Sequence, residues 1–211
     1  MKVLNLYSGI GGNRKLWQNV EVTAVEQNAD IANVYKSFFP NDRVIVGDAH
    51  KYLLEHFADY DFIWSSPPCP THSRARYWGS FRDDTPYVYP DMSLWQEIIF
   101  LQHFAKSAWV VENVQPYYKD LFNGKKIGRH FFWSNFYIPE IEVNEEFKKD
   151  SVQALQELHG INLDGYKIQK QKVLRNCVLP EVGLHVFNCA LKKAPSMPLG
   201  SLFDNVSKNS A

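Results

Sequence analysis

Short apolar runs alternate with longer amphipathic stretches through the first half of the chain. The apolar runs predict strands at Val3–Tyr7, Val22–Glu26, Arg43–Val46, Phe62–Ser65 and Trp109–Glu112. The stretches between them predict helices at Gly12–Gln18, Ala29–Phe39, His50–Phe57 and Met92–Lys106. This alternation is typical of a parallel sheet with helices on both faces. We therefore expect an α/β fold with a doubly wound, mostly parallel sheet.

The pattern weakens in two regions. Between Ser66 and Pro90 the periodicity disappears and five prolines accumulate, which predicts a long loop of the kind that carries function. Beyond Val114, the pattern predicts a strand at Phe131–Tyr137, a short helix at Ser151–Leu158 and a final helix at Gly183–Leu191. The tail from Ala194 is rich in proline and serine, and we expect it to be poorly ordered.

Composition narrows the class of protein. The 211 residues suit one domain, and the 23 basic residues balance the 23 acidic ones, so any nucleic-acid surface must be local. Three widely spaced cysteines argue against a disulfide framework and for a reducing compartment. No signal peptide is evident, and no apolar run approaches the roughly 18 residues that span a bilayer. We expect a cytoplasmic protein that has no membrane contact.

A glycine-rich turn follows the first predicted strand. It has the sequence Tyr7-Ser8-Gly9-Ile10-Gly11-Gly12. Glycines let a ligand approach the backbone, and a helix N-terminus behind them would favour a negative group. A dinucleotide or the carboxylate end of S-adenosylmethionine would fit, and so would a tight turn without a ligand.

Acidic residues end the next two predicted strands. Glu26, followed by Gln27, can accept hydrogen bonds from both hydroxyls of a ribose. Asp48, followed by Ala49, can accept one from an adenine amino group. Each acid alone fits a helix cap or a solvated charge equally well, but three ligand-type features at successive strand ends favour a nucleoside-containing ligand.

Two further strand ends carry reactive side chains. Cys69 lies in Pro67-Pro68-Cys69-Pro70, directly after Phe62–Ser65 and beside a basic loop that can favour its thiolate. Glu112 ends the apolar run that begins at Trp109, where loss of solvent disfavours its charged form and lets it hold a proton. A small buried thiol and a structural acceptor are the alternative interpretations.

Taken in order, these segments resemble the DNA (cytosine-5)-methyltransferase family over Met1–Val114. The specific part is the Pro-Cys turn together with Glu112-Asn113-Val114, each placed after a strand. Two later segments match less closely: Gly128-Arg129-His130-Phe131-Phe132 resembles the family's arginine-bearing strand, and Arg175-Asn176-Cys177-Val178 resembles its C-terminal Asn-Ser-Val segment.

The resemblance implies a Rossmann-like fold and methyl transfer from S-adenosylmethionine to carbon 5 of a flipped cytosine in DNA. Cys69 would add to carbon 6, Glu112 would hydrogen-bond or protonate N3, Arg129 would steady the O2 side and Asn113 would position the loop. The cofactor would be held by Tyr7, Ser8, Gly9, Ile10, Gly11, Gly12, Glu26, Gln27, Asp48, Ala49, Pro67 and Asn176. S-adenosylhomocysteine would be the product.

Several positions depart from the family pattern. Pro70 replaces a glutamine after the cysteine, Asn5 replaces an aspartate before the glycine turn, and Phe131 replaces a second arginine. Only about 40 residues, Tyr137–Arg175, stand where the family has a large target-recognition region. The expected organisation is a catalytic domain at 1–138, a minimal recognition insert at 139–174, a C-terminal helix at 175–193 and a tail at 194–211. We therefore expect short or relaxed sequence specificity, or a second chain or a homodimer that supplies target recognition.

Local basic and aromatic residues are the candidates for binding nucleic acid. They are Arg74, Arg76, Tyr77, Trp78 and Arg82, with Lys125 and Lys126 beside Arg129 and His130. Such residues can hold phosphates and stack bases, although solvated loops have the same composition. Neither the Cys69/His72 pair nor the His185/Cys189 pair has zinc-site spacing, so no metal is expected. An RNA methyltransferase and a non-catalytic regulatory module remain as alternatives.

Overall fold

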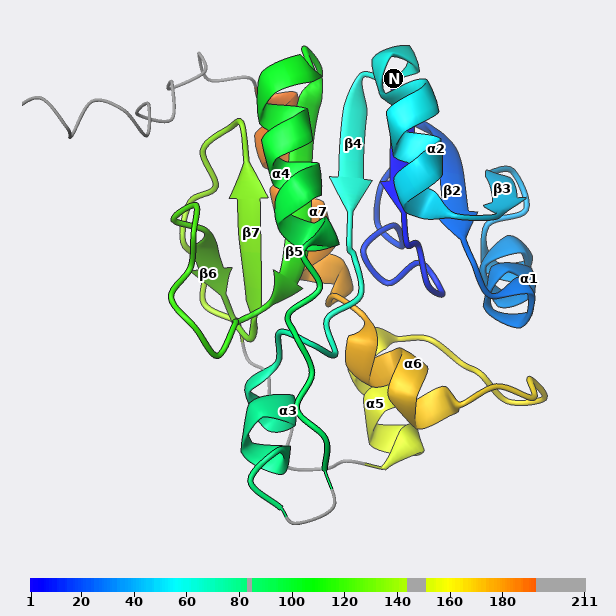
Figure 1. Cartoon of the computed structure of the whole chain (residues 1–211). Helices are drawn as coiled ribbons and strands as arrows, with labels where there is room; N and C mark the ends of the chain where they lie inside the picture. The colour runs from blue at the N-terminus through cyan, green and yellow to red at the C-terminus, as the bar shows by residue number, and fades with distance from the viewer. Residues whose placement is uncertain (83–84, 144–150, 193–211) are drawn as a thin grey trace, which may run out of the picture.

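The computed structural model describes residues 1–82, 85–143 and 151–192, and its centre is a twisted sheet (Figure 1). The strands of this sheet are β1 (Lys2–Leu6), β2 (Glu21–Glu26), β3 (Arg43–Val46), β4 (Phe62–Ser65), β5 (Ala108–Val114), β6 (Lys125–Ile127) and β7 (His130–Ser134). Their order is β3-β2-β1-β4-β5-β7-β6. Strands β1 to β5 run parallel, β7 pairs antiparallel with β5, and β6 pairs antiparallel with β7. The sheet reverses its order beside β1, which is where open α/β sheets bind ligands.

Helices cover both faces of the sheet. They are α1 (Ala29–Phe38), α2 (Ala49–His56), a 3-10 turn η1 (Phe57–Asp59), α3 (Arg74–Gly79), α4 (Ser93–Phe104), α5 (Val152–His159), α6 (Lys170–Asn176) and α7 (Pro180–Leu191). Figure 1 shows α2 and α4 in front of the sheet, α7 behind it, and α3, α5 and α6 beyond its lower edge. These lower helices lie at the carboxyl ends of β1, β4 and β5.

Alternating side chains supply two separate cores. Val3, Trp64 and Val110 point to the face that α7 covers. Leu4 and Val111 point to the opposite face, against α2 and α4. The central strands are buried on both sides, which explains why their sequences are continuous apolar runs. The predicted doubly wound α/β fold is confirmed.

The predicted helix at Gly12–Gln18 is wrong, because this segment forms a series of turns. Arg14 N donates to Gly11 O and Trp17 N donates to Arg14 O, a three-residue spacing instead of the four-residue spacing of an α-helix. Gly11 adopts a φ of +81°, and the backbone of Asn13 comes so close to α7 that a Cβ at Gly183 would clash with it. Tertiary packing has displaced a local helical tendency.

Besides η1, three short elements lie outside the predicted set. The proline-rich stretch contains α3, capped by Ser73 Oγ, which accepts from Arg76 N. The short strand β6 pairs with β7, which itself begins and ends earlier than the predicted strand at Phe131–Tyr137. The helix α6 follows α5, and α7 begins at Pro180, three residues earlier than predicted. Helices of two turns give too little periodicity to be recognised in a sequence.

The helix α5 and the first five residues of α6, Lys170–Leu174, belong to the stretch predicted as a recognition insert, and both helices pack at the carboxyl ends of the parallel strands (Figure 1). Leu155, Val173 and Leu174 share a core with Ile10 of the glycine turn and Val34 of α1. Tyr166 OH also lies 2.6 Å from Ser37 Oγ of α1. Residues 144–150 of the insert and the predicted tail at 194–211 lie outside the described residues. None of the described helices has the length and apolar content needed to cross a membrane.

Candidate active site

A cavity of about 380 Å³ opens at the carboxyl ends of the parallel strands. Most of the residues expected to act in catalysis or to hold the cofactor line it: Tyr7, Ser8, Gly9, Ile10, Gly12, Glu26, Gln27, Pro67, Cys69, Glu112, Asn113, Arg129 and Asn176. They come from β2, β5 and α6, from the turns that follow β1, β2 and β4, and from the turn between β6 and β7. The parallel strands therefore gather one set of side chains at one edge of the sheet.

The glycine turn has an unusual backbone that leaves space for a ligand. Tyr7 and Gly9 have φ values of +53° and +55°, and a Cβ at Gly9 would meet no atom within 4 Å. Glu26 Oε2 accepts from Gly9 N at 3.0 Å, which ties the end of β2 to the turn. Ser8 Oγ is buried without a hydrogen-bond partner among the described residues. A buried hydroxyl in this state needs a polar ligand group or water, so the turn fits a polar ligand.

A buried polar network is hydrogen-bonded to Tyr7, the first residue of the glycine turn. Glu97 of α4 is fully buried, and it accepts from Tyr7 OH at 2.5 Å and from Ser65 Oγ at 2.6 Å. His50 Nδ1 lies 3.0 Å from the same carboxylate. Burial and the charge of Glu97 raise the pKa of Tyr7, so its phenol stays protonated and remains a donor. The network holds the positive-φ residue Tyr7 in place.

Cys69 lies in a turn that is fixed to the neighbouring strand. Asn113 Nδ2 donates to Pro67 O at 2.8 Å, and Cys69 O accepts from His72 N at 3.0 Å. Burial raises the pKa of the Cys69 thiol, and the nearby negative charge of Glu112 raises it further. In the absence of a substrate the residue is therefore a thiol at neutral pH.

Glu112 is the end of a buried chain of three side chains. His130 Nδ1 lies 2.5 Å from Glu112 Oε1, and Arg129 Nε donates to His130 Nε2 at 2.9 Å. Since the arginine must donate, His130 Nε2 carries no proton, and the remaining ring proton is on Nδ1, facing the carboxylate. Arg129 also donates to the backbone carbonyls of Cys177, at 3.1 Å, and Arg175. Arg129 thus fixes the orientation of the His130 ring, and His130 fixes the position of the Glu112 side chain.

Three of the expected cofactor residues do not line this cavity. The Asp48 carboxylate caps α2 by accepting from Lys51 N at 3.0 Å, and Ala49 is buried as the first residue of that helix. A Cβ at Gly11 would clash with Phe39 and Tyr35, so the glycine there permits close packing with α1.

The two predicted basic clusters meet on the surface beside the cavity. Arg74 of α3, Lys126 of β6 and Arg129 line a hollow of about 450 Å³, named here the cationic hollow. It shares Val114 and Arg129 with the cavity that contains Cys69 and Glu112. Lys125 forms an ion pair with Glu140 at 3.4 Å, whereas Arg82 and Trp78 are exposed. His130, grouped with these bases in the sequence, is instead buried against Glu112.

Several lining residues were not singled out from the sequence. Lys172 and Val173 of α6 lie on the same wall of the cavity as Asn176. The positive charge of Lys172 partly offsets the rise in the pKa of the Cys69 thiol. Arg175, the first residue of the segment that resembles the family's Asn-Ser-Val motif, lies beside these α6 residues. No motif marks Lys172 or Val173, because only the packing of α6 near Ile10 and Val34 brings them to the cavity. In the described part of the chain, no group of three or more His, Cys, Asp and Glu side chains could hold a metal ion.

Residues 1–123, more than half of the chain, match the family of C-5 cytosine-specific DNA methylases. The chain belongs to this family. The C-5 cytosine methylase match includes the glycine turn, the Cys69 turn and β5, and it ends before β6. Arg129, His130 and α6 therefore lie outside the matched part, and their place at the cavity is known from the structure alone. No curated protein matches the chain.

Solved structures similar to this chain include two larger proteins and one of about the same length. DNMT2 of Spodoptera frugiperda is 28% identical, with 54% of this chain and 35% of that one covered, at a TM-score of 0.36. A prophage-encoded E. coli protein described as a DNA modification methyltransferase is 20% identical, with 58% and 34% covered, at 0.38. A TehB-like SAM-dependent methyltransferase of Corynebacterium glutamicum is 18% identical, with 54% of each chain covered, at 0.34. The chain spans about a third of the first two and about half of the third.

Proposed function

We propose that this chain methylates carbon 5 of cytosine in DNA, with Cys69 as the nucleophile and S-adenosylmethionine as the methyl donor. The observation that carries the proposal is the single cavity that joins Cys69 and Glu112 to the glycine turn. Cys69, in the turn after β4, and Glu112, on the neighbouring strand β5, can act on one pyrimidine ring, and a ligand bound at the glycine turn would occupy the same cavity. Membership of the family makes this chemistry the first expectation.

The cavity suits the donor at its glycine-turn end. Glu26 is placed to accept from hydroxyl groups there, and the buried Ser8 hydroxyl has no partner in the described structure. When bound, S-adenosylmethionine would supply an electrophilic methyl group on a sulfonium. Ile10 and Val173 would enclose the donor from the side of α6.

The protein's side chains would do the remaining work. Cys69 loses its thiol proton to solvent and adds to carbon 6, while Glu112, which takes up a proton from solvent as the base enters, passes that proton to N3 and becomes a carboxylate again. His130 Nδ1–H, polarised through Arg129, stabilises that carboxylate. Carbon 5 takes the methyl group, water removes the carbon 5 proton, Cys69 leaves as a thiolate, and the N3 proton returns to Glu112.

Access to the ring requires the cytosine to leave its stack. Carbon 6 and N3 cannot both be reached inside a paired duplex, so the base must be extruded into the cavity. The cationic hollow adjoins the cavity through Arg129, and it can hold the phosphates of an extruded nucleotide.

Covalent trapping tests the nucleophile. The protein, S-adenosylmethionine and DNA containing 5-fluorocytosine should give a stable adduct, because fluorine prevents the final loss from carbon 5. Cys69→Ser should abolish the adduct, whereas Cys189→Ser, which changes a partly buried thiol on α7, should retain it. The measurement is mobility on denaturing gels, with the modified peptide identified by mass spectrometry.

The same trapping assay tests whether the substrate is DNA or RNA. Matched single-stranded DNA, duplex DNA and RNA, each with 5-fluorocytosine, separate a DNA methyltransferase from an RNA methyltransferase. An adduct with RNA only would overturn the DNA assignment. The absence of an adduct with all three, under conditions where S-adenosylmethionine binds, would overturn the catalytic proposal.

A further inference from the structure

A second hollow, of about 520 Å³, lies beside α3 and is distinct from the catalytic cavity. Tyr77, Phe81, Tyr87, Tyr89 and Tyr117 supply its aromatic lining, and we name it the aromatic hollow. Thr71, two residues beyond Cys69, also lines it. The aromatic hollow therefore begins where the catalytic turn ends.

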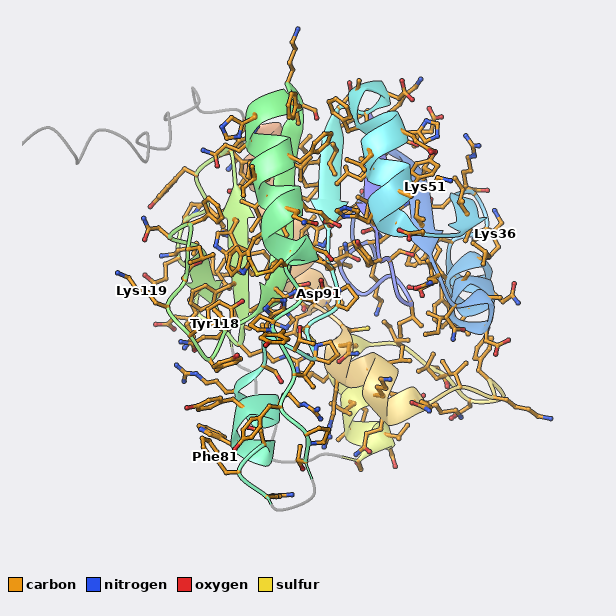
Figure 2. The ribbon with its side chains drawn as sticks, in the orientation of Figure 1. Lys36, Lys51, Phe81, Asp91, Tyr118 and Lys119 are labelled. Carbon is orange, nitrogen blue, oxygen red and sulfur yellow. The ribbon has the colours of Figure 1, made fainter. Side chains whose placement is uncertain are left out.

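The rings of the aromatic hollow are held in a fixed arrangement on one side. Tyr77 stacks on Tyr117 with ring centres 4.6 Å apart and planes 6° from parallel. The ring of Phe81 meets Tyr77 edge-on at 5.1 Å. Tyr117 N donates to His72 O, which fixes this stack to the Cys69 turn. Figure 2 shows Phe81 at the end of the α3 segment that lies farthest from the sheet.

The opposite side of the aromatic hollow is open to solvent. Tyr87 is 82% exposed and Tyr89 is 93% exposed, so neither ring contributes much to the core. Exposed aromatic rings grouped around a hollow are typical of binding surfaces. Arg76 Nη2 donates to Pro86 O, which joins α3 to the segment that carries both tyrosines.

The charged side chain that lines the aromatic hollow is that of Arg76, which can contact a phosphate of a strand bound there. Over residues 66–91 as a whole the sequence balances three arginines with three aspartates, Asp83, Asp84 and Asp91, the first two of which lie outside the described residues. Arg76 lines the aromatic hollow, and Arg74, two residues before it on α3, lines the cationic hollow. One short helix thus contributes to a phosphate-binding surface and to an apolar one, both next to the catalytic turn.

We propose that the aromatic hollow binds an unpaired nucleobase that neighbours the target cytosine on the same strand. Every base has a flat face that stacks on tyrosine or phenylalanine, so this binding tolerates different sequences. The inference rests on the proposed function in assigning a nucleic-acid substrate. It adds that the preferred substrate has unpaired bases around the cytosine, as in a single strand or a loop, because a base within a duplex cannot enter the aromatic hollow.

The test is a binding measurement that needs no chemistry. Cys69→Ser protein without S-adenosylmethionine is titrated into a fluorescent strand of about 12 nucleotides with one cytosine, as DNA or RNA, and into the corresponding duplex. The double substitution Tyr87→Ala with Tyr89→Ala removes the two exposed rings. Tyr137→Ala is the matched control, because Tyr137 is 73% exposed and does not line the aromatic hollow. We expect the double substitution to weaken single-strand binding roughly tenfold and the control to leave it unchanged.

An abasic series identifies the bound base. One nucleotide at a time is replaced by an abasic sugar, and one position beside the cytosine should lower the affinity roughly tenfold for the protein with both tyrosines and have no effect after the double substitution. Equal binding of duplex and single strand, a flat abasic series, or equal losses for the double substitution and Tyr137→Ala would overturn the proposal. Trapping by 5-fluorocytosine can still succeed in those cases, so the two proposals fail separately.

Discussion

At the scale of single residues, the reactivity of Glu112 depends on the ring beside it. His130 is buried with its Nδ1 proton directed at Glu112 Oε1, and Arg129 fixes that tautomer. A donor to a developing carboxylate stabilises it without giving up its own proton. His130 is therefore a positioning residue in the proposed reaction, and Arg129 acts through it.

His130→Leu should slow formation of the 5-fluorocytosine adduct by about 10- to 100-fold, which is the size expected when a hydrogen bond to a charged group is lost. His130→Asn should recover most of the rate, since its amide nitrogen can occupy the place of Nδ1. S-adenosylmethionine affinity, measured by calorimetry, should stay within about twofold for both variants, because the hydrogen bonds of His130 go to Glu112 and Arg129 and not to the glycine turn. Equal rates for the Leu and Asn variants would contradict this role.

Most residues of the candidate site are visible in the sequence because they follow predicted strands. Cys69 and Glu112 come together because β4 and β5 are adjacent and parallel, with Ser65 opposite Val111. The sequence placed His130 in a basic cluster and in the segment that resembles the family's arginine-bearing strand, but it gave the residue no role at Glu112, since no pattern tells which side chain of a short antiparallel strand faces a buried acid. The pairing of Val114 with His130 across β5 and β7 decides that.

At the scale of elements, α6 forms one wall of the cavity although its first five residues, Lys170–Leu174, lie in the predicted recognition insert. Lys172, Val173 and Asn176 reach the same space as Gly9. We propose that this part of the insert closes the donor site. Recognition of neighbouring bases would then fall to α3 and the aromatic hollow.

Hydrogen exchange tests the assignment of α6. S-adenosylhomocysteine at about 100 times its dissociation constant should slow exchange of the amides of the glycine turn and of Lys170–Asn176 together, because a ligand that binds only the native state stabilises what it contacts. The amides of Arg74–Gly79 serve as the internal control and should not change. Protection of the glycine turn without protection of α6 would show that the insert does not close the donor site.

At the scale of the whole molecule, the buried side chain of His159 makes the free energy of unfolding depend on pH. Burial, followed by the positive charge of Arg129, lowers the pKa of His159 on α5 to about 4. The unfolded chain binds this proton near pH 6.5, so between about pH 6.5 and 4 the unfolded state holds a proton that the native state excludes. Stability from this group is complete above pH 6.5 and falls as the pH drops.

We expect the contribution of His159 to lower the free energy of unfolding by about 2 kcal/mol between pH 7.5 and pH 5. His159→Leu should remove that part of the pH dependence, and His103→Leu, which changes an exposed histidine of α4, should leave it intact. Urea denaturation followed by tryptophan fluorescence at both pH values is the measurement. Equal pH dependence in the wild type and in His159→Leu would refute the argument.

The sequence by itself determined the alternating strands and helices and the strand ends that carry Cys69, Glu112 and Glu26, because apolar periodicity and turn residues are local properties of the chain. The tertiary structure alone decided that Gly12–Gln18 turns instead of forming a helix, that His130 meets Glu112, and that α6 lines the cavity. These features depend on the close approach of segments far apart in the sequence, such as Asn13 and Gly183. Such contacts are set by how the layers pack and leave no period in the amino-acid pattern.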